Sequence, residues 1–317
     1  MAEDPFHRQF RHALPLIPKG SRSLVAVSGG QDSVCLLGLL RTFARKQQWQ
    51  IEVAHLDHRW RADSGKVAQK VMILSKAWQL PFHLAIAESP PKSEAAARTW
   101  RYTWLGELAL SLGCDHVLTA HTRTDVVETF LFNLLRGSGS DGLTSLVAER
   151  ILYSTVKLVR PLLNFSREQT GQYCQTHQLP VCVDPTNFDL VYRRNRIRLE
   201  LMPYLQQHFN PQVEASLART ASLLEAEADF LDQAALALVE TCVLEGRLHR
   251  HKLNSAHLAL QRRVVRHWLI KELGHSPNFD QIAVVLACLE APNRNRTSPL
   301  FAGWLVEVQG DWLALVN

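Results

Sequence analysis

The chain has 317 residues, of which 46 % are hydrophobic and 21 % charged, as is ordinary for a soluble globular protein. No stretch approaches the roughly 20 apolar residues of a membrane-spanning helix, and the N-terminal MAEDPFHRQFRH lacks the apolar core of a secretory signal, so we expect a cytoplasmic protein without a membrane partner. The net charge of +5 allows a polyanionic partner but does not by itself identify one.

Short apolar runs alternate with helical patterns over the first 200 residues. The runs predict strands over residues 24–27, 51–56, 81–87 and 116–120. Apolar residues at helical spacing predict helices over residues 33–45, 63–78, 94–111 and 125–135. Continuous apolar strands separated by amphipathic helices predict an α/β fold, a doubly wound and mainly parallel sheet with helices on both faces.

The pattern changes near residue 205, just after Met202-Pro203. Before that point, residues 151–163 hold two further extended runs and residues 181–183 a third. Beyond it, residues 213–238 and 261–290 have helical patterns, and residues 300–316 alternate as a short strand or hairpin does. We therefore expect an α/β domain over residues 1–205 and a smaller, mostly helical domain over residues 206–317.

A glycine-rich loop follows the first predicted strand and precedes the first of the helices, with the sequence Ser28-Gly29-Gly30-Gln31-Asp32-Ser33. Two glycines allow a tight turn, and the backbone N–H groups at a helix N-terminus form an anion site. No lysine follows the glycines, so the loop is not a Walker A motif. An aspartate beside a phosphate is explained if Mg²⁺ lies between them. The simpler alternative is a capped strand-to-helix turn, but the whole hexapeptide is more specific than that.

Polar residues also follow the second and fourth predicted strands, where ligands of a doubly wound sheet lie. His55 and Asp57 are two residues apart and can point the same way from a strand, whereas His58 reads better as an ordinary loop residue. His121, Asp125 and Glu128 step by four and three residues, which predicts one face at the start of a helix. They suit a metal or substrate site, or, alternatively, capping of the helix N-terminus.

The loop S-G-G-x-D-S after a first strand resembles that of the PP-loop ATP pyrophosphatases, which cleave ATP into AMP and pyrophosphate. Further motifs, in their order and spacing, resemble the tRNA(Ile)-lysidine synthetase family over about residues 22–200. They are HLDHRWR, EAAAR-x-x-RY, LTAHTRTDVVETFLFNLLRGSG, RPLL, DPTN at 184–187 and RRNRIR at 193–198. Thr122, Thr124 and Val126 depart from the family pattern, so no role is assigned to them.

This resemblance implies that ATP is a cosubstrate, bound with Mg²⁺. The loop residues Ser28, Gly29, Gly30, Gln31, Asp32 and Ser33 would bind it, together with His55, Asp57, Arg136 and Gly137. Asp32 would also ligate Mg²⁺. ATP would adenylate the C2 carbonyl oxygen of a wobble cytidine and release pyrophosphate, with Arg101 neutralising charge on the α-phosphate.

The resemblance further implies two partners, free L-lysine and the isoleucine tRNA with a CAU anticodon. The ε-amine of lysine would displace AMP, with Asp125 and Glu128 holding the ammonium and His121 or a carboxylate accepting its proton. The cluster that contains Arg194, Arg196 and Arg198 would contact tRNA phosphates, and the C-terminal domain would grip the tRNA. The sequence leaves a homodimer open.

Two alternatives remain. One is a PP-loop enzyme that thiolates tRNA, a chemistry that uses paired cysteines or a metal cluster. The six cysteines include no C-x-x-C pair, which argues against it. The other is a tRNA-binding relative without activity, because fold alone does not prove catalysis. The intact glycine loop and the retention of His121, Asp125 and Glu128 argue against that alternative.

Overall fold

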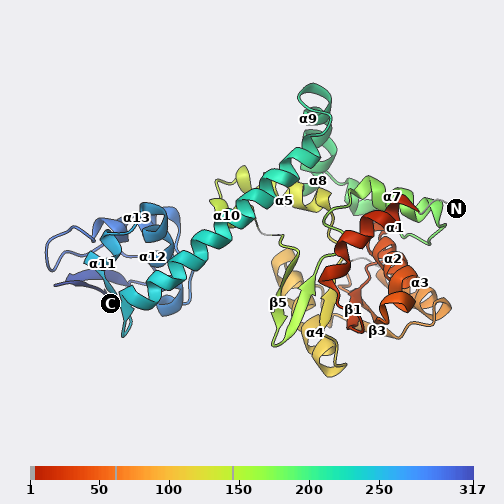
Figure 1. Cartoon of the computed structure of the whole chain (residues 1–317), viewed down its shortest axis with the longest axis horizontal. Coiled ribbons are helices and arrows are strands. Elements are labelled where there is room, and N and C mark those ends of the chain that lie inside the picture. The colour runs from red at the N-terminus through yellow and green to blue at the C-terminus, as the bar shows by residue number, and fades with distance from the viewer. Residues whose placement is uncertain (1–3, 61–62, 145) are drawn as a thin grey trace. The chain divides into compact units, whose positions relative to one another are not determined.

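The computed structural model describes residues 4–60, 63–144 and 146–317. The chain divides into two compact units, Met1–Ser222 and Leu223–Asn317. The division lies inside α10 (Val213–Cys242), an uninterrupted helix in Figure 1, and so falls later than the boundary expected near residue 205. None of the described helices is both long and apolar enough to cross a membrane.

The first unit is built on a six-stranded sheet of order β3-β2-β1-β4-β6-β5. The strands are β1 (Arg22–Ala26), β2 (Gln50–Asp57), β3 (Phe82–Ile86), β4 (His116–Leu118), β5 (Glu149–Tyr153) and β6 (Val156–Val159). Every neighbouring pair is parallel except β5 and β6, which confirms the predicted mainly parallel sheet. The order reverses between β1 and β4, and ligands of such sheets bind beyond the carboxyl ends of the strands at this point.

Helices cover both faces of this sheet. The predicted ones are α2 (Gln31–Gln47), α3 (Ser64–Ala77), α4 (Glu94–Ser111) and α5 (Arg123–Leu134). The sequence pattern did not indicate α1 (Pro5–Phe10) or α7 (Arg167–Thr176). Successive residues of β1 point to opposite faces, so Val25 packs with α2, α3 and α7, whereas Leu24 packs with α4.

Shorter elements complete the first unit: η1 (Arg11–Leu16), α6 (Ser140–Leu143), η2 (Pro185–Phe188), α8 (Arg193–Arg196), the π-helical turn η3 (Ile197–Leu201) and α9 (Met202–His208). Two expectations differ from the structure. The second extended run ends as a strand at Val159, since Pro161 has no N–H to continue the ladder. Residues 181–183 lie outside any strand, and the N–H of Cys182 instead donates to the carbonyl oxygen of Gly29 at 2.9 Å.

The second unit contains the C-terminal part of α10 with α11 (Arg250–Asn254), α12 (Leu258–Leu273) and α13 (Phe279–Ala287). It also has a sheet of order β7-β8-β10-β9, formed by β7 (Val243–Leu244), β8 (Arg247–His249), β9 (Leu305–Gln309) and β10 (Trp312–Val316). The pairing of β9 with β10 confirms the predicted hairpin. The single helical pattern over residues 261–290 corresponds to two helices, because Gly274, at a positive φ, ends α12.

Candidate active site

The glycine loop lies at the point where the strand order of the sheet reverses. Gly29 has a φ of +85°, and a Cβ there would lie 2.8 Å from Cγ1 of Val67, so only glycine fits without strain. Gly30 is the N-cap of α2. The hydroxyl oxygens of Ser28 and Ser33 lie 3.1 Å apart across the loop. The loop therefore combines free N–H groups of a helix N-terminus with two hydroxyl donors, as an anion site requires.

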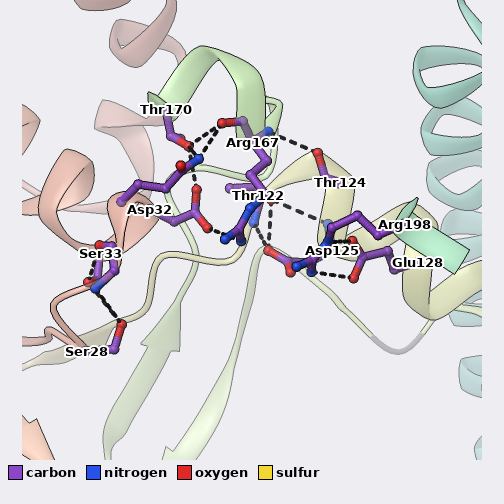
Figure 2. Close-up of polar contacts among 12 residues, drawn as sticks. Ser28, Asp32, Ser33, Thr122, Thr124, Asp125, Glu128, Arg167, Thr170 and Arg198 are labelled. Carbon is purple, nitrogen blue, oxygen red and sulfur yellow. Dashed lines mark hydrogen bonds and ion pairs between the residues drawn. The ribbon is translucent and has the colours of Figure 1, made fainter. Parts of the chain in front are cut away.

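Asp32 and Gln31, in the first turn of α2, are held by the unpredicted helix α7 (Figure 2). Arg167 donates from Nη1 to Oδ2 of Asp32 at 2.9 Å, and the hydroxyl of Thr170 donates to Oδ1. The side chain of Gln31 donates to the carbonyl oxygen of Arg167 at 2.6 Å, so this side chain is bound to the start of α7. Burial raises the pKa of Asp32, although Arg167 and Thr170 oppose the shift.

The end of β2 supplies His55 and Asp57. Nδ1 of His55 lies 2.7 Å from the carbonyl oxygen of Val27, which can only accept, so Nδ1 carries the proton. Burial lowers the pKa of His55, which leaves its Nε2 as an acceptor. Asp57 is buried and accepts the N–H of Arg59 on Oδ1 at 2.8 Å. Arg61, the last residue of the HLDHRWR motif that begins at His55, lies outside the described residues.

The end of β4 supplies His121 and the start of α5. His121 precedes the helix, with Thr122 as N-cap and Asp125 completing a capping box in which its Oδ2 accepts the N–H of Thr122 at 2.7 Å. Asp125 thus has the capping role weighed above, and it also lines the cavity described next. Burial lowers the pKa of His121 to about 4, against the opposing influence of Asp125. His121 is therefore neutral at neutral pH.

These groups line one cavity of about 450 Å³ at the carboxyl edge of the sheet. The predicted residues that line it are Ser28, Asp32, Ser33, His55, Asp57, Arg101, His121 and Asp125. The sequence pattern gave no role to Tyr102, Trp60 or Asp184, which also line it. Asp184 opens the motif DPTN, so this motif was the available signal for it. His58, taken as a loop residue, lines the cavity too, with its Nε2 3.3 Å from Nη2 of Arg101.

Other predicted site residues lie elsewhere. Glu128 is 2 % exposed and is held by Arg198, whose Nε and Nη2 donate to its two oxygens at 2.5 and 2.8 Å (Figure 2). Arg194 donates to Glu94 at 3.2 Å, and Arg196 pairs with Glu200 on the surface. Arg136 lines a second cavity, and Gly137 follows it in the turn after α5.

The electrostatics of the first cavity favour cations near the glycine loop. Four carboxylates line it, those of Asp32, Asp57, Asp125 and Asp184, against the two guanidinium groups of Arg59 and Arg101. A metal cation among these carboxylates would offset their repulsion of a polyanionic nucleotide. Oxygen ligands are those that Mg²⁺ prefers, and each oxygen of Asp32 has a lone pair beyond the hydrogen bond that it accepts. The residues thus fit a magnesium–nucleotide complex.

A family profile described as a PP-loop domain matches residues 2–205, and one described as the TilS substrate binding domain matches residues 248–309. A protein named tRNA(Ile)-lysidine synthase from Gloeobacter violaceus is 57 % identical over 98 % of this chain and 95 % of its own. The chain belongs to the tRNA(Ile)-lysidine synthase family. The protein of that name from Nostoc is 45 % identical over 98 % of this chain and 95 % of its own. The one from Pyropia yezoensis, named as chloroplastic, is 35 % identical over 94 % of this chain and 91 % of its own.

A solved structure of more distant sequence has the same fold as this member of the lysidine synthase family. The U34-tRNA thiolase NcsA from Methanococcus maripaludis, solved with its [4Fe-4S] cluster, aligns with a TM-score of 0.59 at 14 % identity, covering 69 % of this chain and 77 % of its own. At this identity the likeness establishes the fold alone. In the described part of this chain, one group of three metal-binding side chains has its ligand atoms within 4.8 Å of one another. It consists of Asp4, His7 and His177 and contains no cysteine.

Proposed function

We propose that this protein is a cytoplasmic enzyme that ligates free L-lysine to C2 of the wobble cytidine in the isoleucine tRNA with a CAU anticodon, forming lysidine. The observation that carries the proposal is similarity over 98 % of the chain to proteins named tRNA(Ile)-lysidine synthase. The cavity supports it, because one enclosure presents an anion loop, carboxylates and a neutral histidine. These are the groups that an ATP-dependent ligation of an amine needs.

The first step is adenylation of the cytosine. The loop from Ser28 to Ser33 binds the pyrophosphate portion of ATP through backbone N–H groups and hydroxyls. Asp32 would hold Mg²⁺, which supplies charge neutralisation on the phosphates when it is bound. Arg101 lines the same cavity and neutralises charge on the α-phosphate while the cytosine O2 attacks and pyrophosphate leaves.

The second step is attack by lysine. Of the two carboxylates predicted to hold its ammonium group, only Asp125 lines the cavity, so we assign that role to Asp125. Glu128 already has a cation in Arg198, and we assign to this pair the positioning of α5. The ε-amine attacks C2 after losing a proton, and AMP leaves with the oxygen that was the cytosine O2.

His121 has a defined part in that second step. Its pKa of about 4 makes it a poor final acceptor for the proton of an ammonium group, whose ordinary pKa is about 10.4. Its neutral ring instead accepts a hydrogen bond from the ammonium group and orients the amine, while the proton is lost to the bulk solvent. Arg194 and Arg196, on the helix that follows the DPTN motif, contact phosphates of the tRNA.

The test is to incubate the protein with ATP, Mg²⁺, isoleucine tRNA and radiolabelled lysine without a sulfur source. We expect label in the tRNA, with one AMP and one pyrophosphate per lysine. The matched control is the same tRNA with uridine at the wobble position, which should take up no label. Modification that needs sulfur and not lysine would identify a thiolation enzyme, and tRNA binding without AMP release would identify an inactive relative.

A further inference from the structure

A second cavity lies at the other end of α5, still within the first unit, and of its lining the function above uses only Arg196. Its volume is about 640 Å³, within the range of small-molecule pockets. Phe132 in the last turn of α5 and Arg136 just after the helix form one wall, and α8, η3 and α9 form the other with Arg193, Arg196 and Tyr204. The family resemblance implied that Arg136 and Gly137, at this end of α5, bind ATP.

The lining combines cationic groups with one exposed ring, that of Tyr204, and one half-buried ring, that of Phe132. Three arginines face one carboxylate, that of Glu200, and among the described residues only Arg196 pairs with it. The guanidinium of Arg136 lies 5.2 Å from the ring centre of Phe132. Tyr204 leaves 54 % of its surface exposed and contacts the ring of His208, with centroids 4.7 Å apart. An exposed tyrosine ring beside arginines without a carboxylate partner among the described residues suits the flat face of a nucleobase and its phosphate.

The wall that carries these groups is rigid. Ile197, the first residue of η3, is buried and packs with Val127, Leu131 and Met202 in a separate apolar cluster. A π-helical turn is rare and is frequently found at functional sites, and here it joins α8 to α9 beside the cavity. The backbone segment that carries Arg193 and Tyr204 is thus anchored by the buried side chains of Ile197 and Met202.

The two cavities are a helix length apart. Asp125 lines the first cavity and Arg136 the second, and the part of α5 that separates them, Asp125 to Leu134, rises about 14 Å. One nucleotide cannot occupy both. A short stretch of unpaired nucleotides can, and the anticodon loop that contains the wobble base is such a stretch.

We propose that this second cavity binds an unpaired base of the substrate tRNA other than the wobble cytidine, stacked on Tyr204 with its phosphate on Arg193. The inference rests on the proposed function and adds a subsite to it. It makes the distance between two bases of one loop a requirement for binding. A tRNA whose loop cannot reach both cavities would bind only through its phosphates.

The test uses the full chain with tRNA transcripts carrying 2-aminopurine at single loop positions outside the wobble position. We expect one position to be quenched on binding, Tyr204→Ala to abolish that quenching and raise the KM for tRNA about tenfold, and Tyr204→Phe to retain both. Arg193→Ala should reduce the slope of log Kd against log salt concentration by about one, which Tyr204→Ala should not do. The KM for ATP should not change in any of them.

The control is Arg45→Ala, which removes an exposed arginine from the last turn of α2, at the opposite edge of the sheet from the first cavity. If Tyr204→Ala and Arg193→Ala weaken tRNA binding no more than Arg45→Ala does, or if no position is quenched, the second base site is refuted. If the wild-type protein quenches a loop position but transfers no lysine, the proposed function fails and the subsite stands. Lysine transfer with an unchanged tRNA KM in both variants refutes the subsite alone.

Discussion

The ion pair of Glu128 and Arg198 gives the sharpest prediction about stability. The carboxylate of Glu128 is nearly inaccessible, with 3 % of the side chain exposed, and both of its oxygens are bound by the guanidinium of Arg198. Arg198→Met keeps most of the side-chain volume but leaves that carboxylate without a partner. Breaking a buried pair in this way costs about 3–5 kcal/mol, which for a unit of this size lowers Tm by about 6–20 °C.

The pH dependence of this loss has a definite sign. Burial already raises the pKa of Glu128 while Arg198 holds it down, so removing Arg198 raises it further. A carboxyl group whose pKa is higher in the folded than in the unfolded chain destabilises the fold fully above the raised pKa, and this destabilisation decreases at lower pH until it is lost below the pKa of the unfolded chain. The deficit of Arg198→Met relative to wild type should therefore be full at neutral pH and shrink as the pH falls through the raised pKa.

Urea unfolding followed by circular dichroism at several pH values measures this loss. Arg196→Ala is the matched control, since Arg196 stands two residues away in an exposed pair with Glu200 and should matter little. The double variant Glu128→Gln with Arg198→Met should recover most of the loss, because no buried charge then remains. An Arg198→Met protein as stable as Arg196→Ala at neutral pH would show that the pair does not hold α5.

The remaining predictions concern the cavity at the glycine loop. Asp32→Ala should abolish pyrophosphate release, and release at the normal rate would exclude a metal-binding role for Asp32. Gly29→Ala, at a φ of +85° and against Val67, should destabilise the protein by about 1–3 kcal/mol and raise the KM for ATP, as thermal unfolding and kinetics would reveal. His121→Asn should slow lysine transfer with little effect on lysine-independent adenylation. Since the pKa of His121 is about 4, the rate of lysine transfer by the wild-type protein should show no step due to ionisation of His121 between about pH 6 and pH 8. A protonation step in that range that disappears in His121→Asn would contradict this assignment.

Much of the first unit could be predicted because its signals are local. The strands of the parallel part are mainly apolar runs, and α4 begins at Glu94 after a Ser93 cap whose hydroxyl accepts the N–H of Ala96. Helix α7 gave a weaker signal, because its sequence, REQTGQYCQT, is mostly polar and buries only Thr170, Tyr173 and Cys174. The short strands β7 and β8 were missed because two or three residues are too few to show alternation.

The candidate site was predictable where it depends on strand ends and not where it depends on packing between distant segments. His55, Asp57 and His121 lie in the cavity because parallel strands deliver their carboxyl ends to one edge. No local pattern could pair Asp32 with Arg167, which is 135 residues away in the chain, or Glu128 with Arg198. Side-chain pairing at such separations is decided by tertiary packing, which periodicity does not encode.

Helix α5 explains why a continuous motif serves two cavities. Its N-terminal turn carries Asp125, which the positive end of the helix dipole favours, and Arg136 stands just beyond its C-terminal end, where a cation is favoured. The sequence motif runs unbroken over both ends, and the family resemblance implied lysine binding for Asp125 but ATP binding for Arg136. The length of the helix separates them, so the acidic end faces the glycine loop and the basic end faces Arg193. If the subsite holds, α5 sets the distance between the base that is modified and the base that is recognised. An insertion of one residue into α5 would then harm tRNA binding more than ATP binding.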